Sequence, residues 1–312
     1  MNPYFKQYRW SNIFAMLRNL RSAPAVCKAD MRQRLVVITG ATSGIGLETA
    51  KKYAAHGADV LSINRNEEKS KALCEMLKRE YNSNCSYLIA NFSSLADVHR
   101  VGRQLAELDR EIDVLIHNVG AYMTRRTVTA DQLETVFQTN YLSSFILNHA
   151  IKEKMKAQGH GRIIFVNSEA HRFAAWGLHL DDLNWEHHRY SGANSYGHAK
   201  LAQLLSLIKF DEYFSGSGVT INAMHPGNVK TNSGNENGPL YQFFKKNLVD
   251  RTAQEAQISA EALYYLGASS AVEQISGKFF TFTTVEEPAP PALDREAAEQ
   301  LWQISLTLGG IQ

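Results

Sequence analysis

The stretch Leu35-Val-Val-Ile-Thr39-Gly40-Ala-Thr-Ser43-Gly44-Ile45-Gly46 decides the fold of this chain. Its β-branched first half is typical of a buried parallel strand, and its glycine-rich second half is typical of a tight turn. Residues 47–56 continue with the pattern of a helix, which Gly57 ends. Strand, glycine turn and helix in this order predict a dinucleotide-binding unit with the pyrophosphate at the helix N-terminus. The alternative is a tight turn without a ligand.

The glycines of this turn have separate predicted tasks. Gly40 turns the chain, Gly44 lets backbone N–H groups approach the pyrophosphate, and Gly46 lets the helix pack against the strand. The predicted phosphate-binding residues are Gly40, Thr42, Ser43, Gly44, Ile45 and Gly46.

The next predicted strand, residues 59–63, ends in Asn64-Arg65, about twenty residues past the glycines, where the adenosine ribose is bound. An acidic residue there would favour NAD, and none is present. The guanidinium of Arg65 fits a 2′-phosphate, so the sequence predicts NADP rather than NAD as cofactor. The alternative is a solvated Arg65 at the start of a charged helix, residues 65–79.

Tyr196 and Lys200 stand four residues apart and share one face of a predicted helix. A cation beside a phenol favours the phenolate, which lowers the phenol pKa from about 10 toward neutral pH. Tyr196 is therefore a candidate general acid/base. The alternative is an ordinary amphipathic helix, because this spacing also arises by chance.

Together, the turn Thr39–Gly46, the strand end Asn118-Val119-Gly120 and the Tyr196–Lys200 pair resemble the short-chain dehydrogenase/reductase superfamily. The resemblance runs from about Gln33 to near the C-terminus and keeps the family's motif order. It implies an α/β fold, a Rossmann-type doubly wound parallel sheet in one domain (33–312), after an N-terminal amphipathic helical extension (1–32). Alternating strand and helix patterns agree with this fold class.

The resemblance also implies the roles of individual residues. Asn140, in a predicted helix over residues 131–158, would hold a water of the proton relay, and Ser168 would polarise a substrate carbonyl. His117 stands where the family has Asn, and a hydrogen-bonded histidine at a strand end is the plainer interpretation. The implied catalytic residues are Asn140, Ser168, Tyr196 and Lys200, and the implied cofactor contacts beyond the glycine turn and Arg65 are Asn91, Phe92, Asn118, Gly120, Tyr196, Lys200, Pro226, Gly227, Val229 and Thr231.

The sequence interval from Ser168 to Tyr196 is about twice the interval usual in the superfamily. This feature resembles the subgroup of retinol dehydrogenases, the WW-domain-containing oxidoreductase and protochlorophyllide reductase, and it implies a small lipophilic carbonyl or alcohol substrate. A mobile substrate lid is predicted within about 231–255. The predicted apolar wall of the pocket is Phe173, Trp176, Tyr190, Tyr241 and Phe243.

Composition excludes several classes of protein. A net charge of +2 over 312 residues, without a basic stripe, gives no reason to expect a nucleic-acid partner. Three cysteines predict a reducing, cytoplasmic setting without a disulfide framework. The histidine-rich stretch 179–188 lacks the spacing of metal ligands, so no metal is expected.

The first thirty residues include no run long enough to span a bilayer. Apolar side chains recur there at helical spacing among Lys6, Arg9, Arg18 and Arg21, a pattern of helices that lie on anionic membranes. The alternative is a helix packed on the core or on a partner subunit, and homo-oligomers are frequent in the superfamily. The apolar set is Trp10, Ile13, Phe14, Leu17 and Leu20.

These observations predict an NADP(H)-dependent oxidoreductase that transfers a hydride between nicotinamide and the carbonyl or alcohol of a lipophilic substrate, such as a retinal-like aldehyde, a ketone or a steroid. The alternative is a cofactor-binding regulatory or scaffold protein with little turnover, because His117 and Asn91 depart from the family pattern.

Overall fold

The structure, a computed structural model, describes residues 2–20, 22–227 and 255–311. The predicted cofactor contacts Val229 and Thr231 lie outside this part, as do Tyr241 and Phe243 and all but the last residue of the predicted lid at 231–255.

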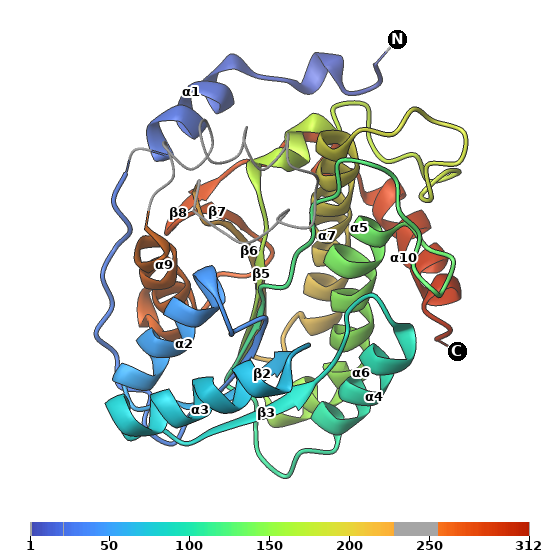
Figure 1. Cartoon of the computed structure of the whole chain (residues 1–312). Helices are drawn as coiled ribbons and strands as arrows, with labels where there is room; N and C mark the ends of the chain where they lie inside the picture. The colour runs from blue at the N-terminus through green and yellow to red at the C-terminus, as the bar shows by residue number, and fades with distance from the viewer. Residues whose placement is uncertain (1, 21, 228–254, 312) are drawn as a thin grey trace.

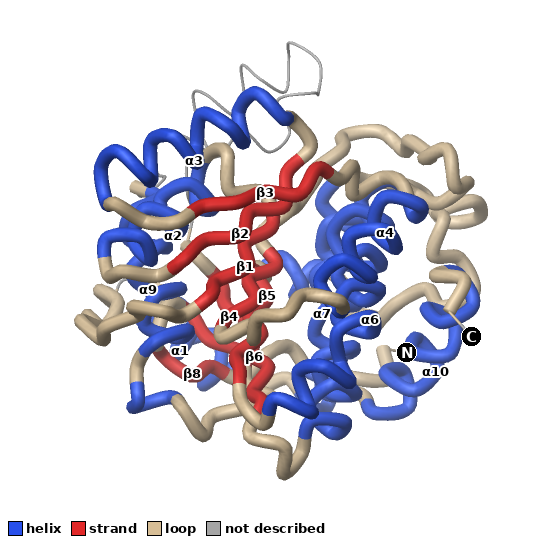
Figure 2. The backbone as a smooth tube through the Cα atoms, turned by 90° about the horizontal axis from the view of Figure 1, so that it is seen from below, coloured by secondary structure: helices blue, strands red, loops and turns tan. Residues whose placement is uncertain are grey.

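One sheet of eight strands forms the centre of the described part, in the order β3-β2-β1-β4-β5-β6-β7-β8 (Figures 1 and 2). Neighbouring strands are parallel from β3 to β7, and β8 is antiparallel to β7 at the edge. The strands are β1 (Leu35–Thr39), β2 (Asp59–Asn64), β3 (Cys85–Ile89), β4 (Val114–His117), β5 (Gly161–Val166), β6 (Val219–His225), β7 (Phe279–Thr281) and β8 (Thr284–Glu286).

Helices cover both faces of the sheet, with α2, α3 and α9 on one face and α4, α6 and α7 on the other (Figure 2). The predicted doubly wound α/β fold is therefore confirmed. The helices are α1 (Trp10–Asn19), α2 (Gly44–Ala55), α3 (Glu67–Tyr81), α4 (Leu95–Ala106), α5 (Thr135–Phe137), the π-helical turn η2 (Gln138–Leu142), α6 (Ser143–Gln158), α7 (Gly192–Phe214), α9 (Ala256–Ala268), α10 (Arg295–Leu308) and the short 3-10 helices η1 (Phe5–Gln7), η3 (Glu169–Phe173), η5 (Ser270–Val272) and η6 (Pro290–Leu293).

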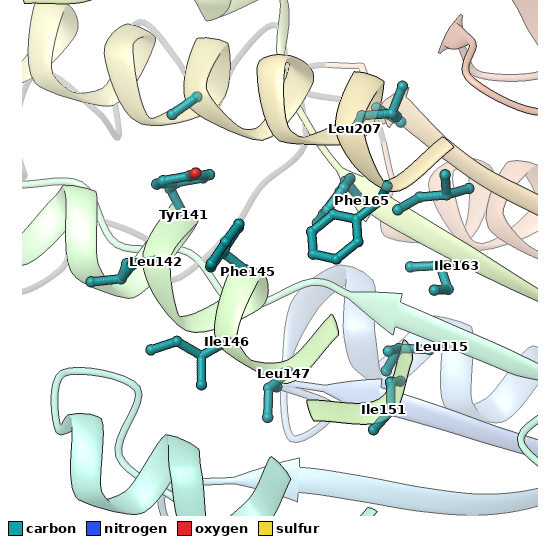
Figure 3. Packing of buried hydrophobic residues seen from close by; sticks show 14 of the residues in the cluster. Leu115, Tyr141, Leu142, Phe145, Ile146, Leu147, Ile151, Ile163, Phe165 and Leu207 are labelled. Atoms are coloured by element: carbon teal, nitrogen blue, oxygen red, sulfur yellow. The ribbon is translucent and has the colours of Figure 1, made fainter. Parts of the chain in front are cut away.

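Apolar side chains on both sheet faces hold these layers together. Every residue of β1 is buried, as expected for a strand that helices cover on both sides. On the face of α6 and α7, Phe145 and Leu147 pack in one cluster with Ile163 and Phe165 of β5 (Figure 3). This rigid sheet fixes the positions of the loops that follow its strands.

The helix predicted over residues 131–158 begins later and is not regular. Its N-terminus is capped by Glu134, whose carboxylate accepts from the Phe137 amide at 2.7 Å, so the helix begins at Thr135. A π-helical turn follows at Gln138–Leu142, where the Ser143 amide donates to the Gln138 carbonyl. Periodicity alone shows neither the cap nor the π-helical turn.

The helix predicted over residues 65–79 also begins later, at Glu67, because Asn66 caps it.

The sequence predicts a reducing setting without a disulfide framework, but the structure joins one pair of cysteines. Cys74 of α3 and Cys85, the first residue of β3, are joined by a disulfide, with their Cα atoms 4.9 Å apart. Asn82, in the left-handed conformation at φ 52°, ends α3 and turns the chain back so that the two residues meet. Spacing in the sequence does not reveal this reversal.

The N-terminal segment lies on the body of the protein, and Figure 1 shows α1 beside β8. Asn19 at the end of α1 donates to the Glu286 carboxylate at 2.9 Å, and the Tyr4 hydroxyl donates to Asp294 at 2.8 Å. The side chains of Trp10, Ile13 and Leu17 lie outside the described part. None of the described helices combines the length and apolarity needed to cross a membrane.

Candidate functional site

A cavity of about 490 Å³ opens at the carboxyl ends of the parallel strands, where such sheets bind their ligands. It brings together residues from both halves of the sheet. Gly46 and Asn140 do not line the cavity, but each packs against or hydrogen-bonds to residues that do. The predicted residues that line it are Gly40, Thr42, Ser43, Gly44, Ile45, Arg65, Asn91, Phe92, Asn118, Gly120, Ser168, Tyr196, Lys200, Pro226 and Gly227.

The glycine turn has the geometry that the sequence predicts. Gly40 and Gly44 both adopt positive φ, at 71° and 57°. A Cβ on Gly46 would overlap the Gly40 carbonyl oxygen and stand 2.6 Å from the Asn118 amide nitrogen, so α2 packs against β1 only with glycine there. A Cβ on Gly44 would meet nothing within 4 Å. The backbone at Gly44 is therefore open to a ligand.

Asn118 holds this turn in place from the end of β4. Its side-chain amide donates to the carbonyl oxygens of Thr39 and Gly40 at 3.1 and 3.0 Å. The Thr39 hydroxyl accepts in return from the backbone amides of Asn118 and Val119 at 2.9 and 3.1 Å. Asn118 thus joins the first strand of the cofactor unit to the neighbouring strand end.

Three side chains line the part of the cavity where the sequence predicts an adenosine, and they belong to Asn64, Arg65 and Asn91. Arg65 is exposed and lines the cavity just after β2. Asn64 is buried, and its Oδ1 accepts from the Ala41 amide at 2.8 Å. The Oδ1 of Asn91, the predicted adenine acceptor, already accepts from the Ser93 amide at 3.1 Å and the Ser93 hydroxyl at 2.7 Å.

His117 points away from the cavity into the layer beneath α6. Its Nε2 lies 2.7 Å from Oδ1 of Asn148, and its ring stacks on Phe165. Burial lowers the pKa of His117 to about 4, so the imidazole is neutral. The plainer interpretation, a hydrogen-bonded histidine at a strand end, is confirmed.

Asn140 lies in the π-helical turn and supports the cavity wall at Ala121. Its Oδ1 accepts from the Ala121 amide at 2.6 Å, and its Nδ2 donates to the Ala121 carbonyl at 3.0 Å. The π-helical turn interrupts the i to i−4 bonding pattern and leaves the Asn140 carbonyl to accept from outside the helix. That carbonyl accepts from the side-chain amide of Gln203 at 2.7 Å.

Ser168 follows β5 and begins η3. Ser168 lines the cavity, and its Oγ accepts from the Ala170 amide at 3.1 Å, so it caps the next segment as well. This bond uses a lone pair and leaves the hydroxyl proton to be donated toward a ligand. The segment is fixed further by Asn167, whose Oδ1 accepts from the Ser168 amide at 2.8 Å.

Tyr196 and Lys200 both lie on α7 and line the cavity on one helix face, as predicted. The Lys200 ammonium lies 5.6 Å from the centre of the Tyr196 ring. It donates to the Val166 carbonyl at 2.8 Å and to Oε1 of Gln203 at 3.2 Å. Burial lowers the pKa of Lys200 to about 7, because an ammonium is costly to remove from water.

The predicted apolar wall is wrong for its described members. Phe173 and Trp176 are 61% and 65% exposed, and the Tyr190 hydroxyl donates to the Met123 carbonyl at 3.0 Å without lining the cavity. Among the cavity-lining residues that the prediction missed are Tyr122, Met123, Thr135 and Thr139. Tyr122 and Met123 lie two and three residues after Gly120, so their position after a strand end is the signal that identifies them.

The histidine-rich stretch 179–188 is ordered around Asp182. Its carboxylate accepts from the backbone amides of Glu186, His187 and His188 and from the His188 ring at 2.8 Å. Within the ranges that the structure describes, no three His, Cys, Asp or Glu side chains are arranged to hold a metal ion.

Comparison with known proteins agrees with this geometry. The short chain dehydrogenase family model matches residues 34–178. Human retinol dehydrogenase 13 is 31% identical over 292 residues, which are 91% of this chain and 87% of that protein. The chloroplastic short-chain dehydrogenase TIC 32 A of Brassica napus is 30% identical over 295 residues, 89% of each chain.

Comparison with solved structures also finds similar proteins. An uncharacterized protein from Mycobacterium paratuberculosis superposes with a TM-score of 0.71 at 25% identity and covers 94% of this chain and 97% of its own. A short-chain dehydrogenase from Sphingobium yanoikuyae in complex with NADPH gives a TM-score of 0.62 at 25% identity, over 75% of this chain and 83% of its own. With the motif order, the sheet topology and these relatives in agreement, the chain belongs to the short-chain dehydrogenase/reductase family of oxidoreductases.

Proposed function

We propose that this protein is an NADP(H)-dependent oxidoreductase that transfers a hydride between nicotinamide and the carbonyl or alcohol carbon of a small lipophilic substrate. The observation that carries the proposal is the shared cavity: Ser168, Tyr196 and Lys200 line the same space as the glycine turn. The retinol dehydrogenase relatives suggest retinal-like aldehydes as the first substrates to test.

The residues present fit a nicotinamide dinucleotide. Ser43, Gly44 and Ile45 line the cavity at the N-terminus of α2, where helix N–H groups have no partner within the helix. Such groups bind a pyrophosphate, and the open position at Gly44 leaves room for it. Arg65 would hold the 2′-phosphate, and Pro226 and Gly227 line the end of the cavity proposed for nicotinamide. When bound, the cofactor supplies or accepts the hydride.

Side chains of the protein transfer the proton to and from the substrate. In the reductive direction, the Ser168 hydroxyl donates to the carbonyl oxygen and stabilises the charge that develops there. Tyr196 gives its phenolic proton to the same oxygen, and the Lys200 cation favours the phenolate that remains. Asn140 with a water would return the proton from solvent. In the oxidative direction, the phenolate accepts the proton of the alcohol.

The decisive experiment combines binding with turnover. NADPH binding is measured by nucleotide fluorescence, and NADPH oxidation is followed over a panel of retinal, long-chain aldehydes, aromatic ketones and a steroid ketone. Turnover of any of them supports the proposal. Binding without turnover favours the alternative of a cofactor-binding regulatory or scaffold protein, and absence of binding contradicts both.

Arg65 gives a prediction about the cofactor. Arg65→Ala is expected to weaken NADPH binding at least about tenfold and to leave NADH binding unchanged, because a charge-assisted pair with the 2′-phosphate contributes about 1.5–3 kcal/mol. Fluorescence titration of both nucleotides measures this. Arg79→Ala, near the far end of α3, is the control, since Arg79 pairs with Glu80 and lies outside the cavity. Equal wild-type affinities for NADPH and NADH would refute the assignment.

We also propose that the N-terminal segment contacts an anionic membrane surface. Phe5 and Phe14 are 73% and 67% exposed, and Lys6, Arg9 and Arg18 beside them are exposed as well. Exposed aromatic rings among cations are typical of interfacial segments.

The membrane proposal predicts that the wild type sediments with vesicles that contain phosphatidylserine. The double variant Phe5→Ser/Phe14→Ser is expected to lose most of this binding, because the rings supply the buried apolar area. Val128→Ser is the matched control, since Val128 is an exposed apolar side chain far from this segment in the sequence. Equal sedimentation of the wild type and the double variant would reject the membrane contact.

A further inference from the structure

The side-chain amide of Gln203 lies between Lys200 and Asn140 of the proposed proton-transfer site, although neither the motifs nor the cavity wall includes it. Gln203 lies on α7, three residues after Lys200, and is buried. Its Nε2 donates to the Asn140 carbonyl at 2.7 Å, and its Oε1 accepts from the Lys200 ammonium at 3.2 Å. Oε1 also accepts from the Asn167 side chain at 3.0 Å.

The chemistry of the partners fixes the orientation of this amide. An ammonium only donates and a carbonyl oxygen only accepts, so Oε1 must face Lys200 and Nε2 must face Asn140. The opposite orientation would place two donors against each other and two acceptors against each other. The Gln203 amide therefore has a single orientation, and its hydrogen bonds to Lys200 and to the Asn140 carbonyl form a bridge between these two residues.

The bridge joins three elements that are far apart in the sequence. Lys200 belongs to α7, Asn140 to the π-helical turn, and Asn167 to the loop between β5 and η3 that also carries Ser168. Asn167 donates in addition to the Lys200 carbonyl at 2.9 Å, and its Oδ1 accepts from the Ser168 amide. One amide thus connects the segments of all the proposed catalytic residues.

The Lys200 ammonium depends on this bridge. A buried ammonium is stable only with hydrogen-bond acceptors, and within the described part of the chain Lys200 donates to two, the Val166 carbonyl and Oε1 of Gln203. Removal of Gln203 deletes one of these acceptors, and the side chains of both Lys200 and Gln203 are buried. The charged form of Lys200 then becomes less favourable.

We propose that Gln203 is a positioning residue of the reaction. Its amide holds the Lys200 ammonium and the Asn140 carbonyl at a fixed separation, and thereby keeps the cation in place for the Tyr196 phenolate. The role of Tyr196 rests on the proposed function, but the frame around Gln203 belongs to the protein without any ligand.

The other groups near Tyr196 come from different elements. Tyr122, in the segment after β4, has its ring 5.8 Å from the Tyr196 ring. His225 at the end of β6 lines the same cavity, and burial lowers its pKa to about 4. A neutral imidazole does not replace the charge of Lys200.

The test measures the pKa of Tyr196 directly. Protein with ¹³C at the hydroxyl-bearing ring carbon of tyrosine is titrated by NMR, and the Tyr196 signal is the one that Tyr196→Phe removes.

Gln203→Met keeps the side-chain length and removes both polar atoms. It is expected to raise the pKa of Tyr196 by about one unit, because the phenolate loses part of the cation that stabilises it. Gln203→Asn keeps the amide but is too short to span both partners, and it should shift the pKa in the same direction.

Ser206→Ala is the matched control on the same helix. Ser206 is buried and donates to the Gln203 carbonyl at 2.9 Å, but it touches neither Lys200 nor Asn140. This variant should leave the Tyr196 pKa unchanged, whereas a role of Gln203 in packing alone predicts no shift in any variant. An unchanged or lowered Tyr196 pKa in a folded Gln203 variant overturns the proposal. If the wild type turns over no carbonyl and the shift is still seen, the proposed function fails while the control of the Tyr196 pKa by Gln203 stands.

Discussion

Tyr196→Phe is expected to lower turnover by at least about 100-fold, the low end for lost general acid/base catalysis. The substitution removes the phenolic oxygen that exchanges a proton with the substrate and keeps the ring that packs beside Tyr122. The glycine turn and Arg65 are untouched, so NADPH binding should stay within about twofold.

The measurement compares kcat for the best carbonyl substrate with the dissociation constant of NADPH from fluorescence titration. Tyr213→Phe is the control, because Tyr213 lies near the end of the same helix and outside the cavity. Loss of both turnover and binding would indicate misfolding. A kcat close to that of the wild type would show that another group transfers the proton.

Gly46→Ala is expected to weaken NADPH binding by at least about 100-fold and to destabilise the fold by about 3 kcal/mol. The new Cβ would overlap the Gly40 carbonyl oxygen and stand 2.6 Å from the Asn118 amide nitrogen. Backbone cannot rotate away as a flexible side chain does, so α2 must move off β1. Its N-terminus, where the pyrophosphate is proposed to bind, moves with it.

Gly216→Ala separates this steric effect from the general cost of replacing glycine. Gly216 has φ 74°, and a Cβ on it would meet nothing within 4 Å, so only backbone strain of about 1–2 kcal/mol is expected. Thermal unfolding and NADPH titration of both variants provide the comparison. Normal cofactor binding by Gly46→Ala would contradict the packing role of this glycine.

The residues that the sequence predicts best are those whose role depends on backbone conformation. Gly40 and Gly44 adopt positive φ, and Gly46 packs closely against its neighbours. A Cβ atom would make each of these arrangements unfavourable, so the pattern of glycines can be recognised without a structure. The β-branched strands and the helix face of Tyr196 and Lys200 follow from periodicity in the same way.

Contacts across the fold cannot be predicted in this way. Gln203 reaches Asn140 over a long stretch of sequence, and Cys74 meets Cys85 only because the chain reverses at Asn82. The apolar-wall prediction is wrong for Phe173 because an aromatic composition does not say which side of a loop faces the cavity. Each of these depends on tertiary geometry rather than local preference.

The π-helical turn at Gln138–Leu142 has a consequence for how this chain tolerates a change in length. A π-helical turn contains an extra residue, which rotates the helix before it by about 100° relative to the helix after it. Deletion of a single residue there would restore a regular α-helix and turn Asn140 away from Ala121 and Gln203. A chain one residue shorter at this turn would therefore have a regular helix and would lose this site.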